Sequence, residues 1–325
     1  MSRNIGKIGL GLLGGFIILT SLIFVGGRVL RANAPEMVFM RGDRDVYVLD
    51  VERGFVRLLA HSDFDMNVPS WSPDGRYLTY TVIDGSGSPR IERVDGSGKI
   101  EQIYREAVPI WSTAWSPKGD ELAFIADERL YLMDANGQNP RALDTPVHSR
   151  SYSLSWSPDG QNVAFIGGGA SAAPYIYLLN VDGCDDAQRA VTRIPADPLA
   201  RPSWSPDSQQ LAFISGSGIY VANSDGSGET QVAQTTMPRS SDWSPDGRLA
   251  FISNLQLFIA SSDGDIQPLV TDLYVDRSPL WSPDGENVAF VSGGDLYLID
   301  PDSGETHLLT PDSDSRAITQ FAWRR

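Results

Sequence analysis

The pentapeptide Trp71-Ser72-Pro73-Asp74-Gly75 decides the fold, because it recurs five more times along the 325-residue chain. The later copies begin at Trp115, Trp156, Trp204, Trp243 and Trp281. Two copies vary: Lys118 replaces the aspartate in one, and Ser208 replaces the glycine in another. The tryptophans are 44, 41, 48, 39 and 38 residues apart. A repeat of this period indicates a protein built from copies of one supersecondary unit.

Each copy has the chemistry of a tight turn between two strands. Proline presets φ, aspartate caps the local backbone, and glycine accepts the exit geometry of the turn. Apolar, β-prone segments come after the turn, as in Leu122–Ile125 and Leu130–Met133, and these predict two further strands. A second glycine turn and a weaker strand, such as Gln267–Thr271, complete the unit. Four antiparallel strands per roughly 40 residues are typical of a β-propeller blade.

The two ends of the repeat region complement each other. Residues 37–59 supply a second, third and fourth strand without a first, and Thr319–Trp323 supply a first strand and then stop. Joining them closes the ring and removes the free sheet edges. We therefore predict an all-β fold: a seven-bladed β-propeller of four-stranded antiparallel blades over residues 37–325, closed by the C-terminal strand completing the N-terminal blade.

The first 36 residues differ from the rest in composition. A short tail, residues 1–7, precedes the run Ile8–Gly27, which is 20 residues without a charge and predicts one transmembrane helix acting as a signal anchor. Residues 28–36 form a linker. A cleaved signal peptide is the alternative, because Ala32-Asn33-Ala34 resembles a cleavage site, although the apolar run exceeds the usual signal length. Gly11 and Gly15 form a GxxxG pair, which either promotes homo-oligomerisation or is ordinary membrane-helix glycine.

The charge distribution suggests the side of the membrane. Arg3 and Lys7 precede the apolar run, Arg28 and Arg31 follow it, and the free amino terminus tips this tie towards an inside N-terminus. All 41 acidic residues follow the run, so the chain without those four basic residues carries a formal charge of −19, against −15 for the whole. We expect a single-pass membrane protein with a periplasmic or cell-surface propeller. Nucleic acid is excluded as a partner, since phosphates require a basic face.

Catalytic and metal-binding patterns are sparse. His61, His148 and His307 fall in three different blades, the first two in predicted loops, and Cys184 is the single cysteine. These groups are too few and too scattered for a metal site, and no Gly-x-Ser-x-Gly elbow occurs in the sequence. The sequence therefore predicts a protein that is not an enzyme and has no cofactor, with a propeller lyase or hydrolase as the least favoured interpretation.

One mouth of the ring should be rimmed by the loops that precede the first strands. Five of these seven loops place an arginine within seven residues of the tryptophan. Arginine suits carboxylate or phosphate, and aromatic rings stack on sugars or peptides. The candidate binding residues are Trp111, Arg150, Tyr152, Arg201, Arg239 and Arg277. The alternative is that the arginines pair with acids and serve structure only, the nearby acids being Asp63, Asp65, Asp242, Asp272 and Asp276.

The repeat, with its core W-S-P-D-G-x-x-L-A-F, resembles the TolB-like β-propeller repeat over residues 37–325. The closure by the C-terminal strand is similar to TolB as well. The TolB propeller has six blades, whereas we count seven, and a membrane segment stands where TolB has a domain that engages partners. The resemblance implies an envelope protein that works by binding. We therefore expect a non-catalytic scaffold for an envelope protein or peptide; the alternative is a module that binds an acidic small molecule or glycan at the mouth.

Overall fold

The computed structural model describes most of the repeat region. Its described residues are 35–83, 89–105, 108, 110–143, 145, 147, 153–167, 173–181, 188–190, 192, 195–197, 200–270, 272–310 and 316–324. The predicted tail, anchor helix, GxxxG pair and most of the linker, in residues 1–34, lie outside these ranges. Within the described ranges, no helix has the length and apolar character needed to cross a bilayer.

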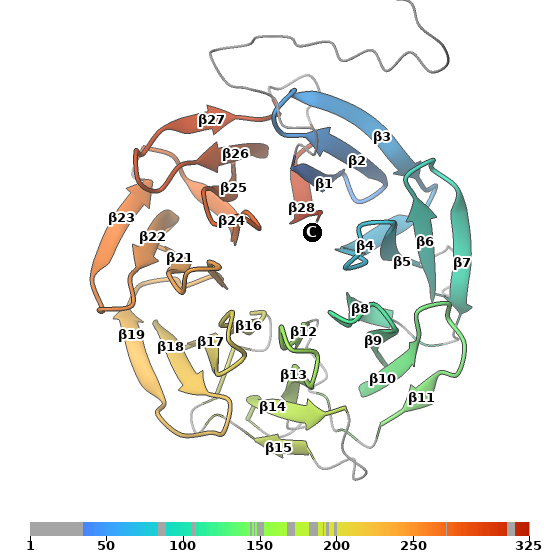
Figure 1. The fold of residues 1–325 in the computed structure, drawn as a ribbon, viewed down its shortest axis with the longest axis horizontal. Coiled ribbons are helices and arrows are strands. Elements are labelled where there is room, and N and C mark those ends of the chain that lie inside the picture. Colours follow the sequence, from blue (N-terminus) through green and yellow to red (C-terminus); the bar gives the residue numbers. More distant parts are fainter. Residues whose placement is uncertain are drawn as a thin grey trace, which may run out of the picture. The chain divides into compact units, whose positions relative to one another are not determined.

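Seven four-stranded antiparallel sheets are arranged around a ring, which confirms the predicted blade number (Figure 1). We name them blades A to G and give the strands from the inside of the ring outwards. Blade A consists of β28 (Ile318–Trp323), β1 (Glu36–Arg41), β2 (Asp45–Asp50) and β3 (Phe55–His61). Blade B consists of β4 (Asp65–Trp71), β5 (Tyr77–Ile83), β6 (Pro89–Asp95) and β7 (Ile100–Arg105). Blade C consists of β8 (Ile110–Trp115), β9 (Glu121–Ala126), β10 (Arg129–Asp134) and β11 (Arg141–Ala142).

The remaining four blades repeat the same connectivity. Blades D and E are β12 (Leu154–Trp156), β13 (Asn162–Gly167), β14 (Tyr175–Asn180), β15 (Gln188–Ala190); and β16 (Ser203–Trp204), β17 (Gln210–Ser215), β18 (Gly218–Asn223), β19 (Thr230–Gln234). Blades F and G are β20 (Ser241–Trp243), β21 (Leu249–Ser253), β22 (Gln256–Ala260), β23 (Ile266–Val270); and β24 (Val275–Trp281), β25 (Val288–Ser292), β26 (Asp295–Ile299), β27 (Thr306–Leu308).

The ring closes through the C-terminal strand, as predicted. In blade A, β28 pairs antiparallel with β1, with Met37 opposite Trp323 and Phe39 opposite Phe321. The backbone N–H of Arg324 donates to the carbonyl of Glu36 at 2.8 Å, and the two side chains form an ion pair. The first and last strands of the ring therefore belong to one sheet.

A cross-strand aromatic pair forms the centre of six blades. In blade C, Phe124 of β9 stands opposite Tyr131 of β10, and the rings stack with centroids 4.9 Å apart. Equivalent stacked pairs are Phe39–Tyr47, Phe165–Tyr177, Phe213–Tyr220, Phe251–Phe258 and Phe290–Tyr297. Such pairs stabilise a sheet beyond the apolar area they bury. The core itself lies between blades, where one cluster packs Ile125 of blade C against Phe165 of blade D.

The Ser-Pro-Asp-Gly segments form the predicted turns, with the serine as their central group. In blade D, the Ser157 hydroxyl donates to Asp159 Oδ1 at 2.5 Å and accepts the N–H of Asn162 at 2.9 Å. The N–H of Gly160 donates to the Ser157 carbonyl, and Gly160 has φ +69°. In blade E, Ser208 takes this left-handed conformation, and its hydroxyl accepts the N–H of Asp159 from blade D. That bond offsets the conformational cost of a non-glycine residue.

Of the seven tryptophans that end the inner strands, four join neighbouring blades through an indole hydrogen bond. The indole N–H of Trp156 in blade D donates to the carbonyl of Ala114 in blade C at 3.2 Å. Equivalent bonds run from Trp115 to Thr79, from Trp204 to Ser155 and from Trp323 to Leu280. The indole rings are largely buried, so each bond satisfies a donor that would otherwise be costly to bury.

The other three tryptophans have no acceptor for the indole N–H among the described residues. Two of them have an arginine of the preceding blade over the ring instead. The guanidinium of Arg324 lies 5.3 Å from the ring centroid of Trp71, and that of Arg248 lies 4.6 Å from that of Trp281. A cation over an indole face is attractive. The seam at Trp243, between blades E and F, has neither of these contacts in the described residues.

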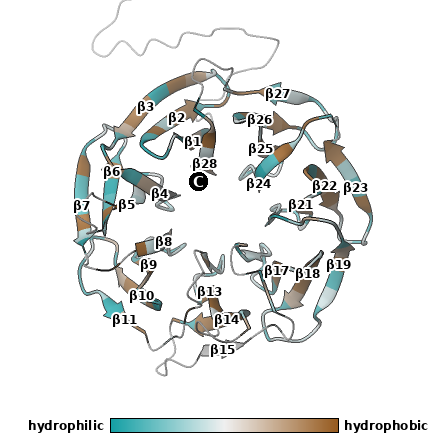
Figure 2. Ribbon diagram, turned by 180° about the vertical axis from the view of Figure 1, so that it is seen from behind, coloured by the Kyte–Doolittle hydropathy of each residue, from teal (hydrophilic) through white to brown (hydrophobic). Residues whose placement is uncertain are grey.

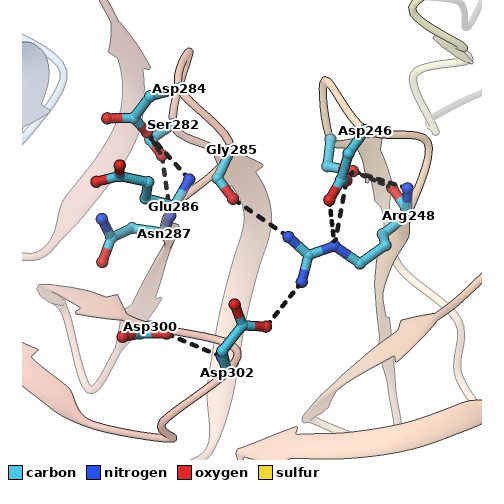
Figure 3. A network of polar contacts seen from close by, with 10 residues as sticks. Asp246, Arg248, Ser282, Asp284, Gly285, Glu286, Asn287, Asp300 and Asp302 are labelled. Atoms are coloured by element: carbon cyan, nitrogen blue, oxygen red, sulfur yellow. Dashed lines mark hydrogen bonds and ion pairs between the residues drawn. The ribbon is translucent and has the colours of Figure 1, made fainter.

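Arg248 also ties blade F to blade G through polar contacts (Figure 3). Its guanidinium forms ion pairs with Asp246 at 2.9 Å and Asp302 at 3.2 Å, and it donates to the carbonyl of Gly285 at 3.3 Å. We call the end of the ring that carries these turns the turn face. On it, the charge of Arg248 is neutralised by its neighbours.

Candidate binding site at the mouth of the ring

The mouth of the ring lies at the end opposite the turn face. Among the described residues, it is formed by loops that lead into the inner strands and by hairpins between the second and third strands. Several side chains at this end are basic, in a chain whose formal charge is −15. The local charge balance at the mouth therefore depends on which of these groups are paired.

One pocket of about 370 Å³ opens at this end, where blades F, G and A meet. Its lining includes Arg239, Asp276, Arg277 and Ile318, and the remaining residues are Val291, Gly294 and Ala317. Two of the six residues predicted from the sequence, Arg239 and Arg277, therefore lie in the same pocket. Ile318 belongs to β28, so the closing strand of the ring supplies part of the wall.

Backbone contacts hold the two arginines at the pocket. Arg239 lies just before β20, and its N–H donates to the carbonyl of Ile252 in β21 at 3.3 Å. Arg277 lies in β24, where the pairing with β25 shifts register on both sides of it. Such an irregularity redirects a side chain away from the regular pleat. The Arg277 side chain is exposed to solvent.

Neither guanidinium at the pocket forms an ion pair with a described residue. The Arg239 side chain donates one hydrogen bond there, from Nη1 to the carbonyl of Asp276 at 3.1 Å. The carboxylate of Asp276 accepts the backbone N–H of Gly293 at 2.8 Å. The guanidinium of Arg277 has no hydrogen bond within the described part of the chain. The pocket thus combines two cationic groups with one acid, whose Oδ2 accepts a backbone N–H.

The β25–β26 hairpin forms one side of the pocket and is clamped to the closing strand. Gly293 and Gly294 turn the chain with φ +59° and +89°. The carbonyl of Gly294 accepts the N–H of Ile318 at 2.9 Å. A Cβ atom at Gly294 would approach Ala317 to 3.2 Å, so both the conformation and the space favour glycine there.

Of the other predicted site residues, the two that belong to the described part of the chain do not line this pocket. Trp111 lies in β8 and is half-buried, packed against the core of blades C and D. Arg201 is exposed and lies just before β16. Arg150 and Tyr152 lie outside the described residues. The sequence reasoning did not single out Tyr274, which is 76% exposed and lies in the loop just before β24, three residues before Arg277. Its aromatic side chain close to that arginine was the available signal.

Other arginines at this end form ion pairs with acids, as the alternative of a purely structural role for the mouth arginines predicts. Arg316 forms an ion pair with Asp45 at 2.5 Å, and Arg41 pairs with Asp295 at 3.5 Å. Burial alone would raise the pKa of Asp45, but hydrogen bonds from His61 and Arg316 outweigh it and hold that pKa below its usual range. These contacts fasten the hairpin of blade A to the residues just before β28 and to blade G.

Two of the three histidines lie in strands of the described residues. His61 was predicted in a loop, but it is the last residue of β3, and its Nδ1 lies 2.6 Å from Asp45 Oδ1. The strand extends further than expected because Asp45 and His61 form the last cross-strand pair of β2 and β3. His307 lies in β27, and His148 is outside the described residues. In the described ranges, no three His, Cys, Asp or Glu groups converge as metal ligands would.

Comparison with known proteins agrees with the ring and its repeats. A family model, the TolB beta propeller domain, matches residues 126–317, which is more than half of the chain. The chain belongs to the TolB β-propeller family. Among curated proteins, the uncharacterized protein Atu1656 of Agrobacterium fabrum is 33% identical over 113 residues, covering 30% of this chain and 38% of that protein. The match thus spans less than half of the relative.

Solved structures of diverse origin share this fold. TolB from Acinetobacter baumannii has a TM-score of 0.53 and 19% identity, over 89% of this chain and 83% of its own. A chain of a nidogen/laminin complex has a TM-score of 0.54 and 12% identity, over 90% of this chain and 98% of its own. A chain of a mitotic checkpoint complex has a TM-score of 0.60 and 20% identity, over 82% of this chain and 87% of its own. At these identities the similarity concerns the fold alone.

Proposed function

We propose that this propeller is a non-catalytic scaffold that binds a protein or peptide of the cell envelope, and that an acidic group of the partner docks between Arg239 and Arg277. The observation that carries the proposal is the pair of guanidinium groups in one pocket without a described ion pair. Arginine forms bidentate, charge-assisted hydrogen bonds with carboxylates. A partner carboxylate would supply the counter-charge that neighbouring acids do not.

The remaining lining of the pocket supports an acidic side chain or chain end. Val291, Ala317 and Ile318 are apolar, and an apolar wall strengthens a nearby charge interaction by excluding water. Tyr274, exposed in the loop before Arg277, adds an amphipathic surface of the kind enriched at interfaces. Two of the similar solved structures are those of protein complexes, by their descriptions, which agrees with a binding role for this one.

The alternative ligand is an acidic small molecule or glycan in the same pocket. The observation that favours it is the volume, since about 370 Å³ lies within the range of small-molecule sites. The chemistry of recognition is shared, because a free carboxylate and a peptide carboxylate present the same two oxygens. The partner's size therefore distinguishes the two ligands, and the test below includes both.

The proposed setting is a membrane, with residues 8–27 as the anchor, the N-terminus inside and the propeller outside the cytoplasm. The ring begins on the turn face, because Met37 lies opposite Trp323 at the turn end of blade A. The nine residues of the linker 28–36 span at most about 30 Å. The linker therefore joins the ring on the turn face.

Photo-crosslinking in native membranes tests the proposal. A benzoylphenylalanine placed at Tyr274, in the full chain, should capture a partner, and the adduct should disappear in the variant with Arg239→Ala and Arg277→Ala. Arg129→Ala is the matched control, because Arg129 is an exposed arginine at the mouth end of blade C that does not line the pocket. An adduct that persists in the double variant overturns the assignment of the pocket.

A thermal-shift screen with citrate and uronic acid oligosaccharides separates the two ligand classes. If one of these ligands raises the unfolding temperature only when Arg239 and Arg277 are present, and no protein adduct forms, the small-molecule alternative replaces the scaffold proposal. Lack of a rise together with an arginine-dependent protein adduct supports the scaffold. The same double variant should keep the unfolding temperature of the free protein, because these guanidinium groups make few described contacts.

A further inference from the structure

Three apolar side chains lie at the mouth end of blade F. Met237 is 56% exposed in the loop before β20, and Tyr274 is 76% exposed in the loop before β24. Leu255, in the hairpin between β21 and β22, is half-buried. The residues on either side of Tyr274, Leu273 and Val275, pack into the core between blades F and G, so the tyrosine ring projects outwards. Blades F and G are neighbours at the right of the ring in Figure 2. We call Met237, Leu255 and Tyr274 the apolar rim.

Backbone hydrogen bonds join the three segments that carry the apolar rim. The N–H of Asn254 donates to the carbonyl of Thr236 at 3.1 Å, and the N–H of Val275 donates to the carbonyl of Leu255 at 2.8 Å. The β21–β22 hairpin is therefore tied to the loop on each side of it. The other two members of the apolar rim are the immediate chain neighbours of Thr236 and Val275, so all three members lie on adjacent segments of the mouth.

The backbone of the apolar rim adopts a conformation that apolar residues seldom take. Met237 and Leu255 both have φ +62°, and Asn254 has φ +50°. Among the described residues these two are the only apolar residues with positive φ; the other non-glycine residues with positive φ are aspartate, glutamate, asparagine or serine. The corresponding hairpin of blade G uses Gly293 and Gly294. Residues strained in this way cluster at binding and active sites, because elsewhere glycine or asparagine adopts the conformation at lower cost.

The apolar rim is continuous with the pocket along the chain. Met237 comes two residues before Arg239, and Tyr274 comes three residues before Arg277. Two and three residues span at most about 7 and 11 Å, so each of these apolar residues lies within that distance of an arginine of the pocket. An extended peptide covers the same distance in two or three residues. One short peptide can therefore contact both the guanidinium groups and the apolar rim.

We propose that the occupant of this site is an extended peptide in which an aspartate or glutamate lies two or three positions from a large apolar residue; the inference rests on the proposed function of the pocket. The carboxylate docks between Arg239 and Arg277, and the apolar side chain packs on the apolar rim. Burial of the apolar side chain contributes affinity, whereas the ion pairs fix the orientation of the peptide. Methionine and tyrosine are enriched at such interfaces, and methionine adapts its shape to the partner.

The charges of the site disfavour a second copy of the chain as the occupant. A symmetric dimer brings the same patch of both subunits together. Arg239 and Arg277 of the two copies would then face each other, and neither forms an ion pair with a described residue. Like charges in opposition weaken association. A peptide that supplies its own carboxylate avoids this repulsion.

Fluorescence anisotropy of the full chain with short labelled peptides tests the inference. Each peptide holds one aspartate in a glycine and serine background, with either phenylalanine or serine two or three positions before or after it. We expect the phenylalanine peptides to bind about tenfold more tightly than the serine peptides, because a large apolar side chain is buried. Met237→Ser with Tyr274→Ser should bring this ratio close to one. Ile266→Ser with Leu308→Ser is the matched control and should keep the ratio, since these exposed apolar residues lie on the outer strands β23 and β27.

The contrary outcomes separate the inference from the proposed function. Equal binding of phenylalanine and serine peptides, lost in Arg239→Ala with Arg277→Ala, overturns the inference and keeps the pocket as the acid site. If no aspartate peptide binds, the pocket is not a peptide site and the inference fails with it. A tenfold ratio that persists in Met237→Ser with Tyr274→Ser places the apolar contact elsewhere. A dimer of the full chain that this double variant converts to a monomer, measured by sedimentation velocity, assigns the apolar rim to a second copy.

Discussion

Arg248 on the turn face and Arg277 at the mouth occupy opposite ends of the ring and have opposite surroundings. Arg248 is 24% exposed, pairs with Asp246 and Asp302, and lies over Trp281. Arg277 lines a pocket with Arg239, and in the described part of the chain nothing pairs with its guanidinium. The difference indicates that the two ends of the ring use their charges differently. Charges at the turn face join blades, whereas we propose that two charges at the mouth bind a ligand.

The acids of the two ends differ in the same way. Asp246 accepts a hydrogen bond from Ser244 and forms an ion pair with Arg248, so it serves the turn and the seam together. Asp276 accepts the N–H of Gly293 and forms no described ion pair with the two arginines beside it. A substitution at the turn face should therefore change stability, and one at the pocket should change binding. The three predictions below test that separation.

The largest expected effect is that of Trp156→Ala at the turn end of blade D. The change empties a buried site and removes the indole bond to Ala114, which should lower the free energy of unfolding by about 3–5 kcal/mol. Trp156→Phe should cost less, because most of the volume remains. Urea denaturation followed by tryptophan fluorescence measures both. Crosslinking to the partner should be weakened far less by Trp156→Ala than by the loss of Arg239 and Arg277. Equal weakening would mean that the two ends of the ring are not independent.

An intermediate effect is expected when the two arginines are replaced in turn. Arg248→Ala removes two ion pairs and the cation over Trp281, so it should destabilise by about 1–2 kcal/mol. Arg277→Ala should change stability by less than about 0.5 kcal/mol. Denaturation midpoints provide the measurement, with crosslinking from position 274 as the binding readout. Equal destabilisation by both variants would contradict the comparison.

The smallest effect concerns pH at the turns. A hydrogen bond from Ser205, with one from the backbone of Gln209, lowers the pKa of Asp207 below its ordinary value of 3.8. A carboxyl whose pKa is lower in the folded protein stabilises it above the unfolded pKa, and this contribution is lost as the pH falls through the folded pKa. The free energy of unfolding should therefore decline below pH 3.8, and less steeply in Asp207→Asn.

Asp127→Asn is the control for this pH dependence, because it removes an exposed charge in the β9–β10 hairpin at the mouth end. Urea midpoints at neutral and acidic pH should keep the wild-type slope in this variant. Identical slopes for Asp207→Asn and the wild-type protein would mean that the turn aspartates do not contribute through their ionised form.

Much of the fold was predictable because its determinants are close together in the sequence. The serine, proline, aspartate and glycine of each turn act within five residues, and the aromatic pairs of the second and third strands are joined by one short hairpin. Even the copy with Ser208 forms the same turn. The candidate pocket was less predictable. Arg201, Arg239, Arg277 and Arg316 occupy similar positions before their tryptophans, yet only Arg239 and Arg277 line it among the described residues.

The sequence by itself determined the seven-bladed ring and its closure, because local turn chemistry and alternating apolar strands repeat without reference to distant parts of the chain. Tertiary structure alone decided which charges are neutralised. Asp45 meets Arg316 across 271 residues, and Arg239 meets the carbonyl of Asp276 from the next blade. The energy of a charge depends on the groups that surround it in space. Only the closed ring brings those groups together.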